Sequence, residues 1–112
     1  MPKSFWVLCV KRVILDENLP VDLRLLLEEF LVVTVSYRGW GGIENGELLR
    51  LVDGEFDVFV TGDKKLRYQQ NLVNRRVAIV ELPNTRLGDI ERYISAVRNA
   101  IRVAEPGSYT RV

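Results

Sequence analysis

Three acidic residues follow apolar runs that are typical of buried strands, and their positions could bring carboxylates together. Asp16 and Glu17 come directly after residues 13–15, and Asp63 ends the segment 57–63. Such acids could cap turns, or they could bind a hard cation such as Mg²⁺ or Mn²⁺, which prefers oxygen ligands. Carboxylates held close together repel each other unless a cation or hydrogen bonds compensate for the charge. Both interpretations stay open, although two strands that end alike favour a metal site.

A second pair of acids lies after a glycine-rich turn. Glu44 and Glu47 are three residues apart in the segment 43–56, so a helix there would place them on one face. Taken alone, this pair is typical of a solvated surface. Trp40, which stands between glycines in RGWGG, favours a packing role under the turn.

A basic segment follows Asp63 directly. The stretch KKLRYQQNLVNRR (64–76) holds five cations and no acid, with a tyrosine and several amide side chains between them. Cations bind a phosphate backbone, and tyrosine and amide side chains can stack on or hydrogen-bond to single-stranded bases. The alternative is a solvated loop without a ligand. The position next to Asp63 favours nucleic acid.

Composition excludes several kinds of chemistry. The 112 residues contain no histidine, which rules out triads, dyads and metal sites that need one. Cys9 is the single cysteine, so the chain has no internal disulfide and no thiolate zinc site. No run reaches the roughly 18 apolar residues of a membrane span. The opening MPKSFWVLCVKR has too short an apolar block for a signal peptide, so we expect a cytoplasmic protein.

The order of the predicted elements indicates one α/β domain. Strands are predicted at 12–16, 31–37, 57–63 and 77–83, and helices at 19–30, 43–56 and 87–104. The strands are apolar throughout, which is typical of a parallel sheet that helices cover on both faces. Ligands of such sheets bind at the carboxyl ends of the strands. Asp16, Glu17 and Asp63 should therefore share one rim.

Three stretches resemble, in the same order, those of small PIN-like domains related to VapC-type toxin ribonucleases. They are VILDENLP (13–20), GWGGIENGELL (39–49) and VFVTGDKKLRYQQNL (58–72). The resemblance covers residues 12–112, and LDEN together with YQQN makes it more specific than either motif alone. It implies a three-layer α/β/α sandwich with a mainly parallel sheet of four to five strands. The domain would span the whole chain, with 1–11 as an N-terminal extension and 107–112 as a C-terminal tail, loose or paired as an edge strand.

The resemblance also implies a set of site residues. The catalytic carboxylates would be Asp16, Glu47 and Asp63. The ligands of Mg²⁺ or Mn²⁺ would be Asp16, Glu17, Asn45, Glu47 and Asp63. The RNA-binding residues would be Lys64, Lys65, Arg67, Tyr68, Gln69 and Gln70. Many relatives carry Asp where this chain has Asn45, and a site with fewer charges binds a cation more weakly.

The function implied by the resemblance is metal-dependent cleavage of single-stranded RNA by the toxin of a toxin–antitoxin pair. Its partners would be RNA, a cognate antitoxin protein and a second copy of the chain, with no membrane. One alternative is a PIN-like protein that binds RNA or a partner without cutting. Another is a receiver-type signalling domain, which needs a lysine at the end of a later strand. Here Glu81 and Leu82 stand before Pro83 instead.

Overall fold

The computed structural model describes residues 10–66 and 75–112, and these form an α/β fold around one parallel sheet. The strands are β1 (Arg12–Leu15), β2 (Leu31–Thr34), β3 (Val58–Thr61), β4 (Ala78–Glu81) and β5 (Tyr109–Arg111). Their order across the sheet is β2-β1-β3-β4-β5, and every neighbouring pair is parallel. The predicted α/β class and the parallel sheet are confirmed.

The strand order places a topological switch between β1 and β3. The chain leaves β1 for β2 on one side and later returns to pair β3 on the other side of β1. Doubly wound sheets bind ligands at such a switch point, outside the carboxyl ends of the two central strands. Asp16 and Asp63 follow these two strands, as the sequence pattern predicts.

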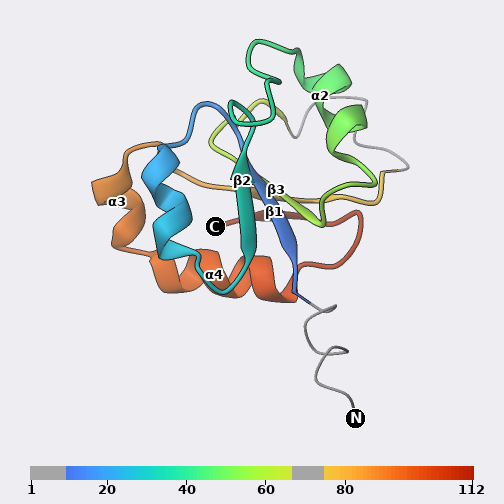
Figure 1. Ribbon diagram of the computed structural model, residues 1–112. Coiled ribbons are helices and arrows are strands. Elements are labelled where there is room, and N and C mark those ends of the chain that lie inside the picture. Colours follow the sequence, from blue (N-terminus) through green and yellow to red (C-terminus); the bar gives the residue numbers. More distant parts are fainter. Residues whose placement is uncertain (1–9, 67–74) are drawn as a thin grey trace.

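Helices cover both faces of the sheet (Figure 1). One face packs against the 3₁₀ helix η1 (Val21–Leu26), α3 (Leu87–Glu91) and α4 (Ile94–Val103), and the other packs against α2 (Asn45–Val52). Successive strand residues point to opposite faces, so the strands are apolar on both. The buried residues of the first face include Val13, Leu15, Val58, Val60, Val80, Leu23, Ile90, Val97 and Ile101. Those of the second include Ile14, Phe59, Ile79, Leu48, Leu49 and Val52.

Two predicted helices are shorter than their sequence patterns indicate. The segment 19–30 forms a helical turn only over Val21–Leu26, because the backbone at Leu27 leaves the helical region with φ −124° and ψ 37°. The amide of Leu31 then donates to the Lys11 carbonyl and begins β2, which leaves no length for further turns.

The predicted helix 87–104 is interrupted at Tyr93. The backbone there has φ −125° and ψ 29°, and the chain continues as a second helix from Ile94. The Tyr93 carbonyl accepts bonds from the amides of Ala96 and Val97, as the residue that starts a new helix does. The break changes the direction of the chain while Ile90 and Val97 both stay in the same core.

The C-terminal segment pairs with the sheet. Tyr109–Arg111 form β5, which lies beside β4 at one edge, and the amide of Val112 donates to the Glu81 carbonyl. The expected tail 107–112 is therefore part of the fold. Within the two described ranges, no helix has the length and apolar character needed to cross a membrane.

Lys11 ties the start of β1 to the end of α4. Its ammonium donates to the carbonyls of Ile101, Arg102 and Ala104 at 2.9, 2.9 and 2.7 Å. The last carbonyls of a helix have no partner within the helix and carry the negative end of its dipole, so an ammonium there is stabilising. Partial burial lowers the pKa of Lys11, while Asp57 acts in the opposite direction.

Lys11→Met should remove these three bonds while keeping most of the apolar stem. We expect the free energy of unfolding to fall by about 1–3 kcal/mol, because charged hydrogen bonds are lost and carbonyls are left partly unpaired. Urea denaturation measures this change. Lys64→Met, at an exposed lysine, is the matched control and should be neutral. Equal stability of the two variants would contradict a stabilising role for Lys11.

Candidate functional site

Among the predicted site residues that the structure describes, Asp16 is the most buried. It follows β1 directly, its amide donates to the Val60 carbonyl at 2.9 Å, and the residue is 6% exposed. One carboxylate oxygen accepts from the Glu17 amide at 2.8 Å and the other from the Thr61 hydroxyl at 2.7 Å. Burial raises the pKa of Asp16, the two hydrogen bonds lower it, and the nearby carboxylates of Glu17 and Asp63 raise it further, with a net upward shift.

Thr61 links Asp16 to Asp63, and it is not among the site residues predicted from the sequence. This last residue of β3 is fully buried, donates to Asp16, and accepts from the Asp63 amide at 3.0 Å. The available signal was a polar residue at the end of an otherwise apolar strand, two positions before an acid. Threonine is common in strands, however, so the pattern alone does not single it out.

Asp63 lies at the same rim and is held by two further bonds. One oxygen accepts from the Lys65 amide at 2.9 Å, which closes a local turn. The other accepts from the side-chain nitrogen of Asn45, the first residue of α2, at 2.9 Å. The structure thus brings together Asp16, Asp63 and Asn45 from three separate segments. Asn45 turns its amide nitrogen toward Asp63, and not the oxygen that a cation ligand would use.

Glu17 points to the glycine-rich turn. The amide of Gly42 donates to both of its carboxylate oxygens at 3.2 and 3.1 Å. A side chain at Gly41 would place its Cβ 3.1 Å from the same carboxylate. Gly42 has φ +82°, a conformation that favours glycine. The neighbouring Asn18 accepts from the Gly62 amide at 3.3 Å, a rim contact that the sequence analysis did not include.

Trp40 packs under this turn, as predicted. It contacts the core around α2, and its ring lies edge-to-face with Phe56 at a centroid distance of 6.4 Å. The Arg38 guanidinium lies 4.4 Å from the centre of the Trp40 ring.

Glu47 does not join Asp16 and Asp63 at the rim. It lies in the first turn of α2, its side chain is 53% exposed, and a carboxylate oxygen is 3.4 Å from an Arg50 nitrogen. Across residues 10–66 and 75–112, no three acidic or other metal-binding side chains gather closely enough to hold an ion. Of the three expected catalytic carboxylates, Asp16 and Asp63 therefore lie at the same rim, and Glu47 does not.

The basic segment begins at the rim. Lys64 and Lys65 follow Asp63 and are exposed to solvent. The predicted RNA-binding residues Arg67, Tyr68, Gln69 and Gln70 lie outside the described residues.

The capping interpretation of the acids holds only in part. The residue before η1 is Pro20, and no side chain caps that helix, so neither Asp16 nor Glu17 acts as its cap. Asp63 does close a turn through Lys65, as that interpretation proposed.

Asp16 and Asp63 could contribute two oxygen ligands to a hard cation. Each oxygen of Asp16 and Asp63 already accepts one hydrogen bond and retains a second lone pair. Mg²⁺ commonly uses one or two carboxylates and completes its shell with water and substrate phosphate. Two carboxylates beside two lysines fit that pattern. Comparisons of the chain with protein-family models, curated proteins and solved structures found no match.

Asp16→Asn should stabilise the protein at neutral pH. Because the pKa of Asp16 is raised by folding, the native state holds this proton more tightly than the unfolded chain. Stability contributed by the protonated acid is present at low pH and is lost as pH rises from the unfolded pKa through the raised native value. Melting temperatures measured across acidic pH should show this fall in the wild type and a flatter curve in Asp16→Asn. If the melting temperature of Asp16→Asn depended on pH as steeply as that of the wild type, folding would not raise the pKa of Asp16.

Gly62→Ala should destabilise the rim. A Cβ at Gly62 would lie 2.5 Å from the Thr85 methyl group, which a short branched side chain cannot easily move away. We expect a loss of about 1–3 kcal/mol in denaturant unfolding. Gly88→Ala is the matched control, since its Cβ meets nothing within 4 Å and alanine favours helix α3. Adding Thr85→Ala to Gly62→Ala should restore most of the loss, and no recovery would contradict the proposed clash.

Proposed function

We propose that this protein is a metal-dependent endoribonuclease that cleaves single-stranded RNA at the rim between β1 and β3. The observation that carries the proposal is the convergence of Asp16 and Asp63 on Thr61, at the switch point where sheets of this order bind ligands. A buried acid whose pKa is raised by burial and by neighbouring carboxylates is typical of functional sites. The resemblance to PIN-like toxin ribonucleases supplies the reaction class.

Each rim residue has a defined task in this proposal. Asp16 and Asp63 would hold Mg²⁺ or Mn²⁺, which when bound lowers the pKa of a water molecule and offsets charge on the phosphate. The Thr61 hydroxyl orients the Asp16 carboxylate, and Asn45 orients that of Asp63. Lys64 and Lys65 bind the flanking phosphates.

The remaining parts of the proposal rest on the resemblance alone. They are a role for Glu47 and Glu17 as further ligands, RNA contacts from residues 67–70, a cognate antitoxin, a homodimer and a cytoplasmic location. Asn45 in place of an acid makes metal binding weaker in this proposal, and activity correspondingly low.

A second candidate function is binding of RNA without cleavage. It is favoured by the missing third acid and by the hydrogen bonds that already occupy both carboxylates. A receiver-type domain would share the strand order and the acids after β1 and β3. However, β4 is followed by Leu82 and Pro83 where phosphotransfer requires a lysine.

The deciding experiment is a titration of Mg²⁺ and of Mn²⁺ into wild-type protein and Asp63→Asn. Cleavage of a labelled single-stranded RNA and the melting temperature are followed together. In the wild type, metal should switch on cleavage and raise the melting temperature, because an ion that binds only the folded state stabilises it. Asp63→Asn should lose both effects.

Glu91→Gln is the control for the loss of one exposed negative charge, and it should behave as the wild type. RNA binding that needs no metal and yields no products would support the second candidate. Cleavage that survives in Asp63→Asn would show that another site or a contaminant is responsible.

Thr61→Val should test the positioning role of the hydroxyl. Valine keeps the shape of threonine but can neither donate to Asp16 nor accept from the Asp63 amide. We expect the rate of cleavage to fall by about 10²-fold, since a misplaced carboxylate near the reacting atoms costs this much. Thr61→Ser keeps the hydroxyl and should recover most of the rate. A valine variant as active as the serine variant would contradict the role.

A further inference from the structure

The edge strand β2 lies open on one side of the sheet. Within the two described ranges it pairs with β1 alone, at the end of the strand order. Its sequence LVVT contains no charge, proline or glycine, although natural edges are commonly protected by such residues. An unprotected edge of aliphatic residues and threonine is a surface that a further strand can join.

The hydrogen-bonding groups on this edge can be assigned from the ladder. The amides of Leu31 and Val35 donate to the carbonyls of Lys11 and Leu15, so the odd-numbered groups face β1. Amide directions alternate along a strand, which turns the N–H groups of Val32 and Thr34 and the Val32 carbonyl outward. The Thr34 carbonyl accepts from the Arg38 amide at 3.2 Å. The edge thus offers two donors and one acceptor.

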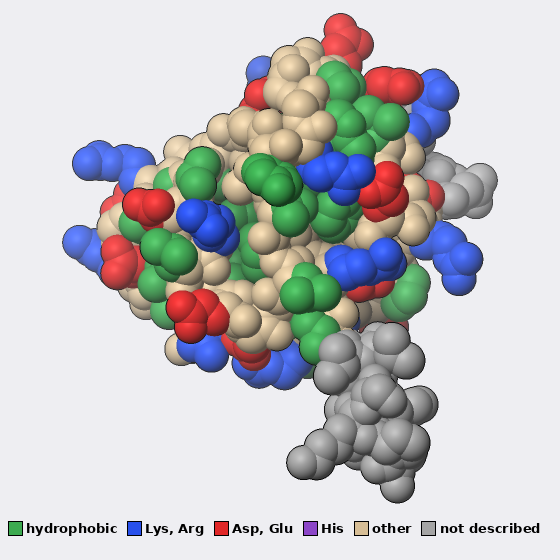
Figure 2. Space-filling model, viewed as in Figure 1, with side chains coloured by type: hydrophobic (Ala, Val, Ile, Leu, Met, Phe, Trp, Pro, Cys, Tyr) green, Lys and Arg blue, Asp and Glu red, His purple; other side chains and the backbone are tan. Residues whose placement is uncertain are grey.

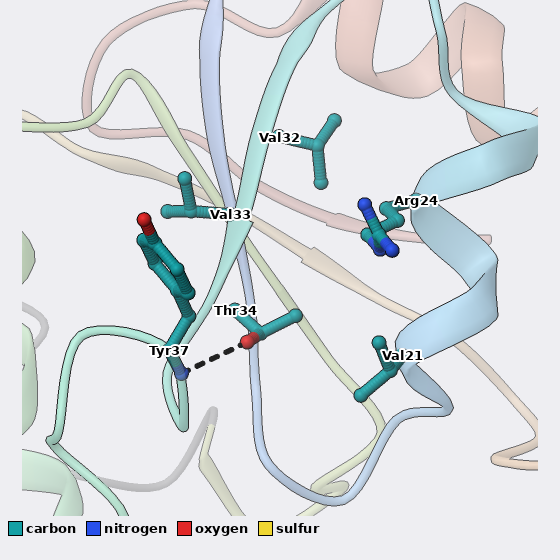
Figure 3. Close-up of a pocket in the computed structure, with 6 residues that line it drawn as sticks. All are labelled: Val21, Arg24, Val32, Val33, Thr34 and Tyr37. Carbon is teal, nitrogen blue, oxygen red and sulfur yellow. Dashed lines mark hydrogen bonds between the residues drawn. The ribbon is translucent and has the colours of Figure 1, made fainter.

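A groove of about 440 Å³ runs along this edge (Figure 3). Val21 and Arg24 come from η1 on one side of β2, while Val33 and Tyr37 lie on the other side. Val21 is 52% exposed and Tyr37 is 80% exposed, so apolar surface is available on both sides. Figure 2 shows hydrophobic side chains gathered over this part of the surface. A strand laid along β2 would place alternate side chains against the two sides.

Arg24 sets the charge of the groove. Its guanidinium lines the cavity, and in the described part of the chain no acidic side chain pairs with it. An occupant that carries a carboxylate at the matching position would complete this pair. A second copy of the chain fits less well, because its own β2 segment, LVVT, carries no carboxylate to pair with Arg24.

We propose that the β2 edge binds an extended acidic segment of a partner protein, which adds to the sheet as a further strand. The segment takes its main-chain hydrogen bonds from Val32 and Thr34. Its apolar side chains contact Val33 and Tyr37 on one side of β2, and its carboxylates face Arg24 on the other side. This surface is formed by η1 and the β2 edge and does not depend on the proposed ribonuclease activity.

Fluorescence anisotropy with two labelled hexapeptides tests the proposal on the full-length chain. One peptide alternates valine and glutamate, and the other alternates valine and lysine. The wild type should bind the glutamate peptide at least about tenfold more tightly than the lysine peptide, since charge pairs set such preferences. Arg24→Glu should reverse this order. Arg92→Glu, at an exposed arginine that does not line the groove, is the matched control and should bind as the wild type.

Val32→Pro tests the main-chain contacts. Its N–H faces away from β1, so proline should remove a donor from the open edge without breaking the existing ladder. We expect the melting temperature to stay close to that of the wild type and binding of the glutamate peptide to be lost. If the variant unfolds, the charge reversal at Arg24 remains an independent test.

Three outcomes would overturn the proposal. Equal binding of both peptides by the wild type would show that Arg24 selects no charge, and absence of saturable binding would show that the edge does not accept strands. A wild-type dimer that Val32→Pro converts to a monomer, measured by light scattering, would show that a second copy occupies the edge.

Discussion

The hydrogen bond from the Thr61 hydroxyl to the Asp16 carboxylate joins the ends of the two central strands, and the polar rim is built around it. Parallel pairing brings all carboxyl ends to one edge, so residues that follow β1 and β3 must meet there. The register matters equally: a shift of β3 by one residue would turn Thr61 to the opposite face of the sheet. Apolar packing of β3 on both faces holds that register, because Phe59 and Val60 lie in different cores.

Burial of Asp16 has an energetic cost that the fold must offset elsewhere. A carboxylate that is nearly inaccessible and close to two other acids favours its protonated form, which accounts for the raised pKa. Packing alone would be served better by an apolar residue at this position. The hydrogen bonds from Thr61 and the Glu17 amide offset part of this cost.

The two ends of the sheet have different physical characters. At the amino end, Lys11 ties α4 to the start of β1 through backbone carbonyls, a contact that contributes stability. At the carboxyl end, turns rich in glycine and polar side chains surround the acids. The β2 edge differs from both ends, because its outward backbone N–H and C=O groups can form hydrogen bonds with another strand. Anchoring the helices at one end leaves the loops at the other end free to carry a site.

Long apolar runs and helical spacing determined most of the secondary structure from the sequence alone. The strands β1, β3 and β4 and the helix α2 lie within their predicted segments, and α2 buries Leu48, Leu49 and Val52. The placement of Asp16 and Asp63 on one rim also followed from the pattern, since it needs only parallel strands. These features depend on local composition, which a sequence displays directly.

Tertiary structure decided the features that depend on contacts between distant segments. The 3₁₀ helix ends early because β2 must begin beside Lys11, and Tyr93 interrupts the last helix so that both parts reach one core. Thr61 links the rim acids because its hydroxyl donates to Asp16 after β1 and accepts from the amide of Asp63 in the following turn. Glu47 lies near Arg50 on the surface of α2. The sequence separation of Glu47 from Asp16 and Asp63 does not show whether these acids share a site. Sequence determined which residues could meet at the rim, and packing decided which of them do, because hydrogen bonds require the three-dimensional path of the chain.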